Sequence, residues 1–162
     1  MSEMDLLEGK RILIVDDEPD VLETLGEILS NCDVTKALKF DEGMKMLEEK
    51  VFDIAILDIM GVDGFKLLEE ARKRQVIPVM LTANALSPEN IIRSYHEGAA
   101  SYVPKDEMGN IKVFLYDILE AKQRGKSTWW RWFDRLAGVW EKKFGPDWKK
   151  KDKEFWEKFP TL

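Results

Sequence analysis

Five polar side chains stand at the ends of four short apolar segments of the sequence. Asp16 and Asp17 end the first segment, and Asp58 ends the second. Thr82 ends the third segment, and Lys105 follows the fourth. Mg²⁺ prefers oxygen ligands such as carboxylates, and a carboxylate can also attack phosphorus to form an aspartyl phosphate. A metal ion, an ammonium group and a hydroxyl neutralise the phosphoryl oxygens during transfer. The five residues therefore predict a magnesium site beside an aspartate that accepts a phosphoryl group.

The five residues come together only if the apolar segments are strands of one parallel sheet. The segments are short and rich in Ile, Val and Leu, as strands buried on both faces are. In an open α/β sheet, ligands bind at the carboxyl ends of the strands. Strands are expected over 11–16, 33–36, 53–58, 77–82 and 100–103, with helices beginning near 18, 41, 64, 87 and 110. This alternation predicts an α/β fold, a doubly wound five-stranded parallel sheet of the flavodoxin-like order 2-1-3-4-5.

The charge distribution divides the chain into two parts. Residues 1–120 hold 13 Lys/Arg against 25 Asp/Glu, a net charge of −12, whereas residues 121–162 hold 12 against 6, a net charge of +6. All six tryptophans lie beyond residue 124. We therefore expect a lead over 1–8, the α/β domain over 9–124 and a Trp/Lys-rich amphipathic helical extension over 125–162.

The composition also bounds the environment. Cys32 is the single cysteine, so no disulfide within the chain and no cysteine-based metal site is expected. The N-terminus lacks the apolar stretch of a signal peptide, and no apolar run approaches the roughly 20 residues that span a bilayer. These features favour a cytoplasmic protein.

Four segments of the chain resemble the receiver domain of two-component response regulators. They are Ile14–Pro19, Leu57–Met60, Leu81–Ala83 and Gly98–Lys105, and they occur in the family's order. The resemblance covers about residues 9–124. It implies a signalling protein rather than a turnover enzyme, in which a sensor histidine kinase or a phosphotransfer protein donates a phosphoryl group to Asp58 and thereby switches an interaction surface.

The resemblance also implies a role for each site residue. Mg²⁺ is implied as the cofactor, held by Asp16 (through a water), Asp17, Asp58 and the backbone carbonyl of Met60. The phosphoryl oxygens would be contacted by Thr82, Lys105 and the backbone amide of Ala83. Thr82 and Tyr102 would form the switch, in which the tyrosine rotates inward when the threonine moves toward the phosphoryl group. Met60 and Asn84 occupy the positions that tune dephosphorylation.

The sequence departs from the family pattern near the predicted site. The loop between Asp58 and Gly64 is two residues shorter than usual and lacks its proline, which is expected to move the Met60 carbonyl and weaken the metal site. Asp106 replaces the usual proline after Lys105. This replacement is expected to change how far the Lys105 ammonium extends toward the phosphoryl site. An apolar Met60 cannot orient an attacking water, so slow dephosphorylation is expected. The departures leave an alternative open, a degenerate receiver that acts as a phosphorylation-independent scaffold; a hydrolase using the same acids is more distant.

The extension contains two amphipathic segments separated by Gly145-Pro146. Ser127 or Thr128 is expected to cap the first. The aromatic and apolar positions are Trp129, Trp132, Phe133, Leu136, Val139, Trp140 and Phe144 in the first segment and Trp148, Phe155, Trp156 and Phe159 in the second. Three occupants fit these faces. The first is the chain's own receiver domain, the second is a protein partner or second copy that binds when phosphorylation releases or exposes the extension, and the third, which fits less well, is an anionic membrane. Nucleic acid is not expected, because six acids are interspersed.

Overall fold

The computed structural model describes residues 5–83, 87–147, 149–150 and 153–158. The five strands form one parallel sheet in the order β2-β1-β3-β4-β5, which confirms the predicted fold. The strands are β1 (Arg11–Val15), β2 (Asp33–Ala37), β3 (Ile54–Asp58), β4 (Ile77–Thr82) and β5 (Ser101–Pro104). The helices around them are α1 (Pro19–Ile28), α2 (Phe40–Glu49), α3 (Gly64–Lys73), α4 (Pro88–His96) and α5 (Ile111–Gln123).

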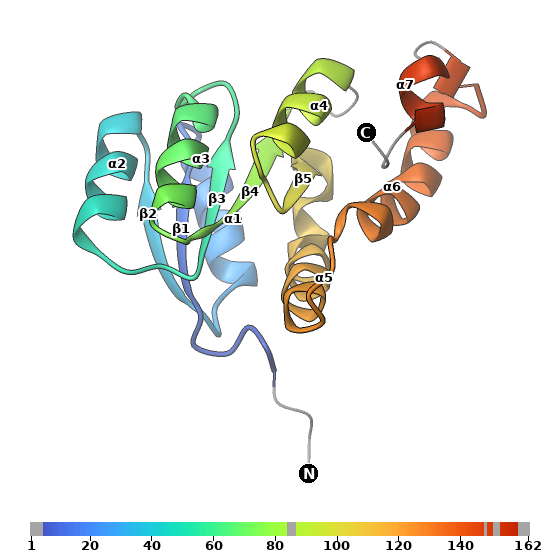
Figure 1. The fold of residues 1–162 in the computed structure, drawn as a ribbon. Coiled ribbons are helices and arrows are strands. Elements are labelled where there is room, and N and C mark those ends of the chain that lie inside the picture. Colours follow the sequence, from blue (N-terminus) through green and yellow to red (C-terminus); the bar gives the residue numbers. More distant parts are fainter. Residues whose placement is uncertain (1–4, 84–86, 148, 151–152, 159–162) are drawn as a thin grey trace.

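Helices cover both faces of the sheet (Figure 1). Helices α1 and α5 contact each other on one face, and α2 and α3 contact each other on the other. Helix α4 lies beside α3, where the guanidinium of Arg93 stacks 4.1 Å from the centre of the Phe65 ring. The sheet is buried between these layers, and β3 has no exposed residue. A continuous core of this kind gives the strand ends a rigid frame.

Local sequence signals account for several helix boundaries. Ser87 accepts a hydrogen bond from the backbone N–H of Asn90 at 3.3 Å, as its N-cap position predicts, and Pro88 follows at the first helical position. The 3₁₀ helix η1 (Lys105–Asn110) between β5 and α5 was not predicted. The lead is partly packed on the domain, since Leu7 is buried and the Tyr116 hydroxyl donates to Asp5 at 2.6 Å.

Helix α6 (Trp129–Phe144) lies beyond β5, at the edge of the sheet (Figure 1). Three side chains at its start donate hydrogen bonds to backbone carbonyls of the β5 segment. The Thr128 hydroxyl donates to Ala100, the Trp129 indole N–H donates to Ala99 at 3.0 Å, and the Trp132 indole N–H donates to Tyr102. Thr128 stands at the N-cap position of α6, but its side chain makes no capping hydrogen bond; the Ser127 hydroxyl accepts from the backbone N–H of Trp129 at 3.2 Å.

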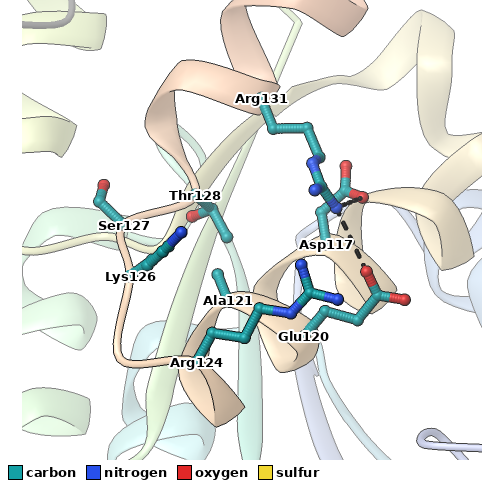
Figure 2. Close-up of a pocket in the computed structure, with 8 residues that line it drawn as sticks. All are labelled: Asp117, Glu120, Ala121, Arg124, Lys126, Ser127, Thr128 and Arg131. Carbon is teal, nitrogen blue, oxygen red and sulfur yellow. Dashed lines mark hydrogen bonds and ion pairs between the residues drawn. The ribbon is translucent and has the colours of Figure 1, made fainter.

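Ion pairs join α6 to α5 (Figure 2). Asp117 is a buried carboxylate on α5, and both Arg131 (3.4 Å) and Arg135 (2.8 Å) pair with its Oδ1. Arg131 also lies 3.2 Å from Glu120. The pocket at this junction has a volume of about 210 Å³. Its charged lining residues are Asp117, Glu120, Arg124, Lys126 and Arg131. Because a buried charge without a partner is costly, Asp117 favours the docked position of α6.

Aromatic rings continue from this junction into α7 (Lys153–Lys158). The ring centres of Trp129 and Trp132 are 5.0 Å apart, those of Trp132 and Trp140 are 5.5 Å apart, and those of Trp140 and Trp156 are 5.5 Å apart. Edge-to-face contacts of this kind add to the stabilisation from burial. Trp148 and Phe159 lie outside the described residues. Within the described part of the chain, no helix combines the length and apolar character that crossing a membrane requires.

Candidate functional site

The predicted site residues meet at the carboxyl ends of the strands. Asp16 directly follows β1, Asp58 ends β3, Thr82 ends β4, and Lys105 directly follows β5. Asp16, Asp58 and Thr82 are all buried, while Asp17 is exposed at the rim. The parallel register places the end of β3 beside the end of β4, so that Asp58 pairs with Leu81. The sheet thus brings two buried carboxylates and a buried hydroxyl to one edge.

Lys105 reaches across this edge to three carboxylates. Its Nζ lies 3.0 Å from Asp16 Oδ2, 3.0 Å from Glu18 Oε1 and 3.5 Å from Asp58 Oδ1. Asp16 Oδ1 also accepts a hydrogen bond from the Glu18 backbone N–H at 2.8 Å. The residue that replaces proline after the lysine therefore does not prevent the ammonium from reaching Asp58.

Negative charge is in excess around Lys105, since its single ammonium contacts three carboxylates. Burial raises the pKa of Asp58, and the neighbouring charge of Asp16 raises it further, against the opposing effects of Lys105 and the Gly61 N–H. Burial also raises the pKa of Asp16. Burial acts to lower the pKa of Lys105, but its hydrogen bonds to Asp16 and Glu18 outweigh this effect and raise it. One ammonium therefore does not neutralise the cluster, which fits a site for an additional cation.

The acids after β1 are candidate ligands for such a cation. Carboxylate oxygens of Asp16, Asp17 and Glu18 lie within 4.8 Å of one another. Hard oxygen donors in this number suit Mg²⁺, which is usually bound by one or two carboxylates together with waters and phosphate oxygens. Sequence reasoning assigned Asp16, Asp17, Asp58 and the Met60 carbonyl to the metal, and the geometry adds Glu18 as a further candidate ligand. The run of three consecutive acids was the signal that could have included it.

The short loop after β3 packs tightly on the acids. The backbone N–H of Gly61 donates to Asp58 Oδ2 at 3.3 Å. A Cβ at Gly61 would stand 2.4 Å from Asp17 Cγ, and a Cβ at Gly64 would stand 2.2 Å from the Asp58 carbonyl oxygen. Gly64 therefore requires glycine, because backbone blocks the space, whereas a side chain at Gly61 would have to displace the Asp17 carboxylate. The Met60 side chain is 79% exposed at the rim.

Replacing Gly61 by alanine is expected to weaken Mg²⁺ binding by about tenfold or more, the scale typical of groups that orient metal ligands. The added methyl group would displace the Asp17 carboxylate, which it would otherwise overlap. Isothermal titration calorimetry with MgCl₂ measures the effect. Gly109→Ala is the matched control, since a Cβ at Gly109 would meet nothing within 4 Å. Equal affinity in the two variants would contradict this account of the loop.

The Mg²⁺ affinity is expected to decrease as the pH is lowered, beginning at a higher pH than that at which ordinary aspartates take up a proton. Metal ligands must be deprotonated, and burial holds the pKa of both Asp58 and Asp16 above the usual 3.8. Protons therefore compete with the metal as pH falls through these raised pKa values. Titrations with MgCl₂ at a series of pH values measure this dependence, and an affinity that stays constant down to pH 3.8 would contradict it.

The predicted switch residues Thr82 and Tyr102 are joined by a side-chain hydrogen bond. Tyr102 on β5 is completely buried, which raises the pKa of its phenol to about 12, while hydrogen bonds to the Thr82 side chain and the Ser87 backbone act to lower it. Ala83 is exposed next to Thr82, in the place where its amide is expected to serve the phosphoryl group. Asn84 lies outside the described residues.

Comparisons with known proteins agree with this geometry. The family model described as "response regulator receiver domain" matches residues 12–113. Two-component response regulator ARR11 of Arabidopsis thaliana is 29% identical over 93% of this chain and 32% of its own length. Transcriptional activator protein PfeR of Pseudomonas aeruginosa is 34% identical over 59% of this chain and 32% of its own length. The chain thus spans about a third or less of the curated relatives it matches.

Solved structures show the same likeness. The response regulator receiver domain protein (CheY-like) of Methanospirillum hungatei JF-1 is 31% identical, and the match covers 69% of this chain and 98% of that one with a TM-score of 0.58.

Proposed function

This chain belongs to the response regulator receiver domain family, and we propose that it accepts a phosphoryl group on Asp58 and thereby switches an interaction surface. The observation that carries the proposal is the buried Asp58 carboxylate, which lies 3.5 Å from Lys105 and beside the acids that suit a divalent cation. The donor is a sensor histidine kinase or a phosphotransfer protein. The proposal places the protein in the cytoplasm, where such donors are charged from ATP.

The chemistry is an in-line displacement at phosphorus. An Asp58 carboxylate oxygen forms the new P–O bond while the bond from phosphorus to the donor atom breaks, and the donor leaves with the bonding electron pair. Lys105 moves its ammonium onto the transferred group and offsets its charge. Thr82 and the Ala83 amide donate to the remaining oxygens. Mg²⁺, held by Asp16, Asp17, Asp58 and the Met60 carbonyl with Glu18 close by, supplies further charge neutralisation when it is bound.

The alternative of a phosphorylation-independent scaffold gains no support from the comparisons. Its motivation was the altered loop and the missing proline. Against it, Lys105 contacts both Asp16 and Asp58. In the shortened loop, the Gly61 backbone N–H donates a hydrogen bond to the Asp58 carboxylate.

Slow hydrolysis of the aspartyl phosphate is expected. The apolar Met60 side chain stands exposed beside the site and offers no atom that orients an attacking water. After the phosphodonor is removed, the loss of phosphoryl mass from the intact protein measures the lifetime. We expect Met60→Asn to shorten it, because an amide can hold a water. A wild-type lifetime of only seconds would contradict this expectation.

Beryllofluoride binding tests the proposed function, because this anion mimics a phosphoryl group bound to a carboxylate. A bound ¹⁹F NMR resonance is expected when Mg²⁺ and beryllofluoride are both present. It should be absent without Mg²⁺ and absent in Asp58→Asn, whereas Asp63→Asn, changed at an exposed acid of the same loop, should keep it. A bound signal that persists in Asp58→Asn would overturn the assignment of the phosphoacceptor.

A further inference from the structure

The start of α6 is fixed on the strand that carries the predicted switch residue. Trp132 is 2% exposed, and its indole N–H donates to the backbone carbonyl of Tyr102. The two rings also meet edge to face, with centres 6.1 Å apart and planes at 83°. A residue of the extension therefore contacts both the backbone and the side chain of Tyr102.

Tyr102 is held in its inward position from both sides. On the inner side, its hydroxyl is hydrogen-bonded to Thr82 and to the backbone of Ser87. On the outer side, Trp132 packs on the ring, and Trp129 and Trp140 pack on Trp132 in turn. Turning the phenol outward would require the volume that Trp132 fills, because this indole is buried against β5. An outward Tyr102 and a docked α6 thus exclude each other.

We propose that the docking of α6 is coupled to the phosphorylation site through the contact between Tyr102 and Trp132, so that phosphorylation strengthens the docking of the extension. The inference rests on the proposed function, in which the phosphoryl group draws Thr82 toward Asp58 and selects the inward tyrosine. This sign is opposite to the release of the extension, which was one possibility raised by its composition.

Other contacts fix α6 without taking part in the coupling. Arg131 and Arg135 pair with Asp117 on α5, and Thr128 bonds to the Ala100 carbonyl. These contacts contribute to docking without touching Tyr102, so only the Trp132 contact depends on the position of the tyrosine. Coupling between two sites is reciprocal, so a docked α6 must raise the affinity of the site for a phosphoryl mimic by the same factor as the mimic strengthens docking.

Hydrogen exchange on the full chain tests the sign of the coupling. With Mg²⁺ present, adding beryllofluoride is expected to slow backbone amide exchange over residues 129–140. Asp58→Asn should show no such change. Unchanged or faster exchange over 129–140, in a sample whose ¹⁹F spectrum shows bound beryllofluoride, would overturn the coupling and leave the proposed function standing. Absence of any bound resonance would instead count against the proposed function, and the coupling would fall with it.

The reciprocal effect is measured with two variants of Trp132. Trp132→Leu removes both ring and donor, and Trp132→Phe keeps a ring and removes the donor. The affinity for beryllofluoride in Trp132→Leu is expected to fall by about 5-fold to 150-fold, the usual range of coupling between sites, with Trp132→Phe in between. Asp134→Ala, an exposed position on the same helix, is the control and should bind as the wild type does. Equal affinity in all four proteins would overturn the proposal.

Discussion

Lys105→Met is expected to slow phosphoryl transfer to Asp58 by about 100-fold to 1,000-fold. Removing one preorganised group that stabilises developing charge typically has this effect. Methionine keeps the length and the apolar stem of the side chain and deletes the ammonium that lies 3.5 Å from Asp58. The rate is followed as phosphoryl mass gained from acetyl phosphate. Lys73→Met is the control, since Lys73 makes only an exposed ion pair with Glu69. A rate within a factor of two of the control would contradict the assigned role.

The same substitution is expected to destabilise the metal-free protein by about 3 kcal/mol, as when one partner of a buried ion pair is removed. Asp16 has no exposed surface, and without Lys105 its charge has no cationic partner among the contacts described above. Mg²⁺ should restore part of the loss, because a divalent cation also compensates the acids and binds only the folded state. Urea unfolding with and without MgCl₂ measures both effects. Equal losses in the presence and absence of the metal would argue against a cation site here.

Trp132→Ala is expected to weaken the docking of α6 on β5 and to lower the free energy of unfolding by about 3–5 kcal/mol, the usual effect of truncating a buried tryptophan. The indole is buried between Tyr102, Trp129 and Trp140, and it satisfies the Tyr102 carbonyl. Because this contact joins α6 to the domain, the substitution should destabilise α6 locally. Amide exchange should therefore speed up more over residues 129–140 than over β1 and β3.

Asp134→Ala is the control for this variant as well, since an exposed substitution usually changes stability by at most about 0.5 kcal/mol. Arg135→Ala gives a graded comparison, because it weakens the ion pair with Asp117 but leaves Trp132 in place. Exchange over 129–140 that is the same in Trp132→Ala and Asp134→Ala would show that α6 does not depend on the indole.

The sheet and its functional edge could be predicted because the signals are local. Apolar runs ending in Asp16, Asp58 and Thr82 indicate buried strands, and parallel strands necessarily bring their carboxyl ends together. Ser87 caps α4 for the same local reason, since its hydroxyl lies three residues before the N–H it accepts from. The placement of these residues follows from these patterns, whereas the strand order was predicted as the common one for five alternating strands and helices.

The contacts between distant residues could not be predicted. The ion pair between Glu18 and Lys105 joins residues 87 positions apart, and nothing in either segment indicates it. The short loop indicated a perturbed site, but its actual effect, the Gly61 backbone against Asp17, depends on loop coordinates. Likewise, the spacing of the aromatic residues predicts an apolar face on α6 but does not say which surface covers it. Only the structure shows that β5 and Tyr102 do.

Intact-mass spectrometry after incubation with acetyl phosphate and Mg²⁺ tests the central claim most directly. The account predicts that the wild-type chain gains one phosphoryl group, that the gain requires Mg²⁺, and that Asp58→Asn shows none. An unmodified wild-type chain at every Mg²⁺ concentration, or an equal gain in Asp58→Asn, would contradict the claim that Asp58 is the phosphoacceptor.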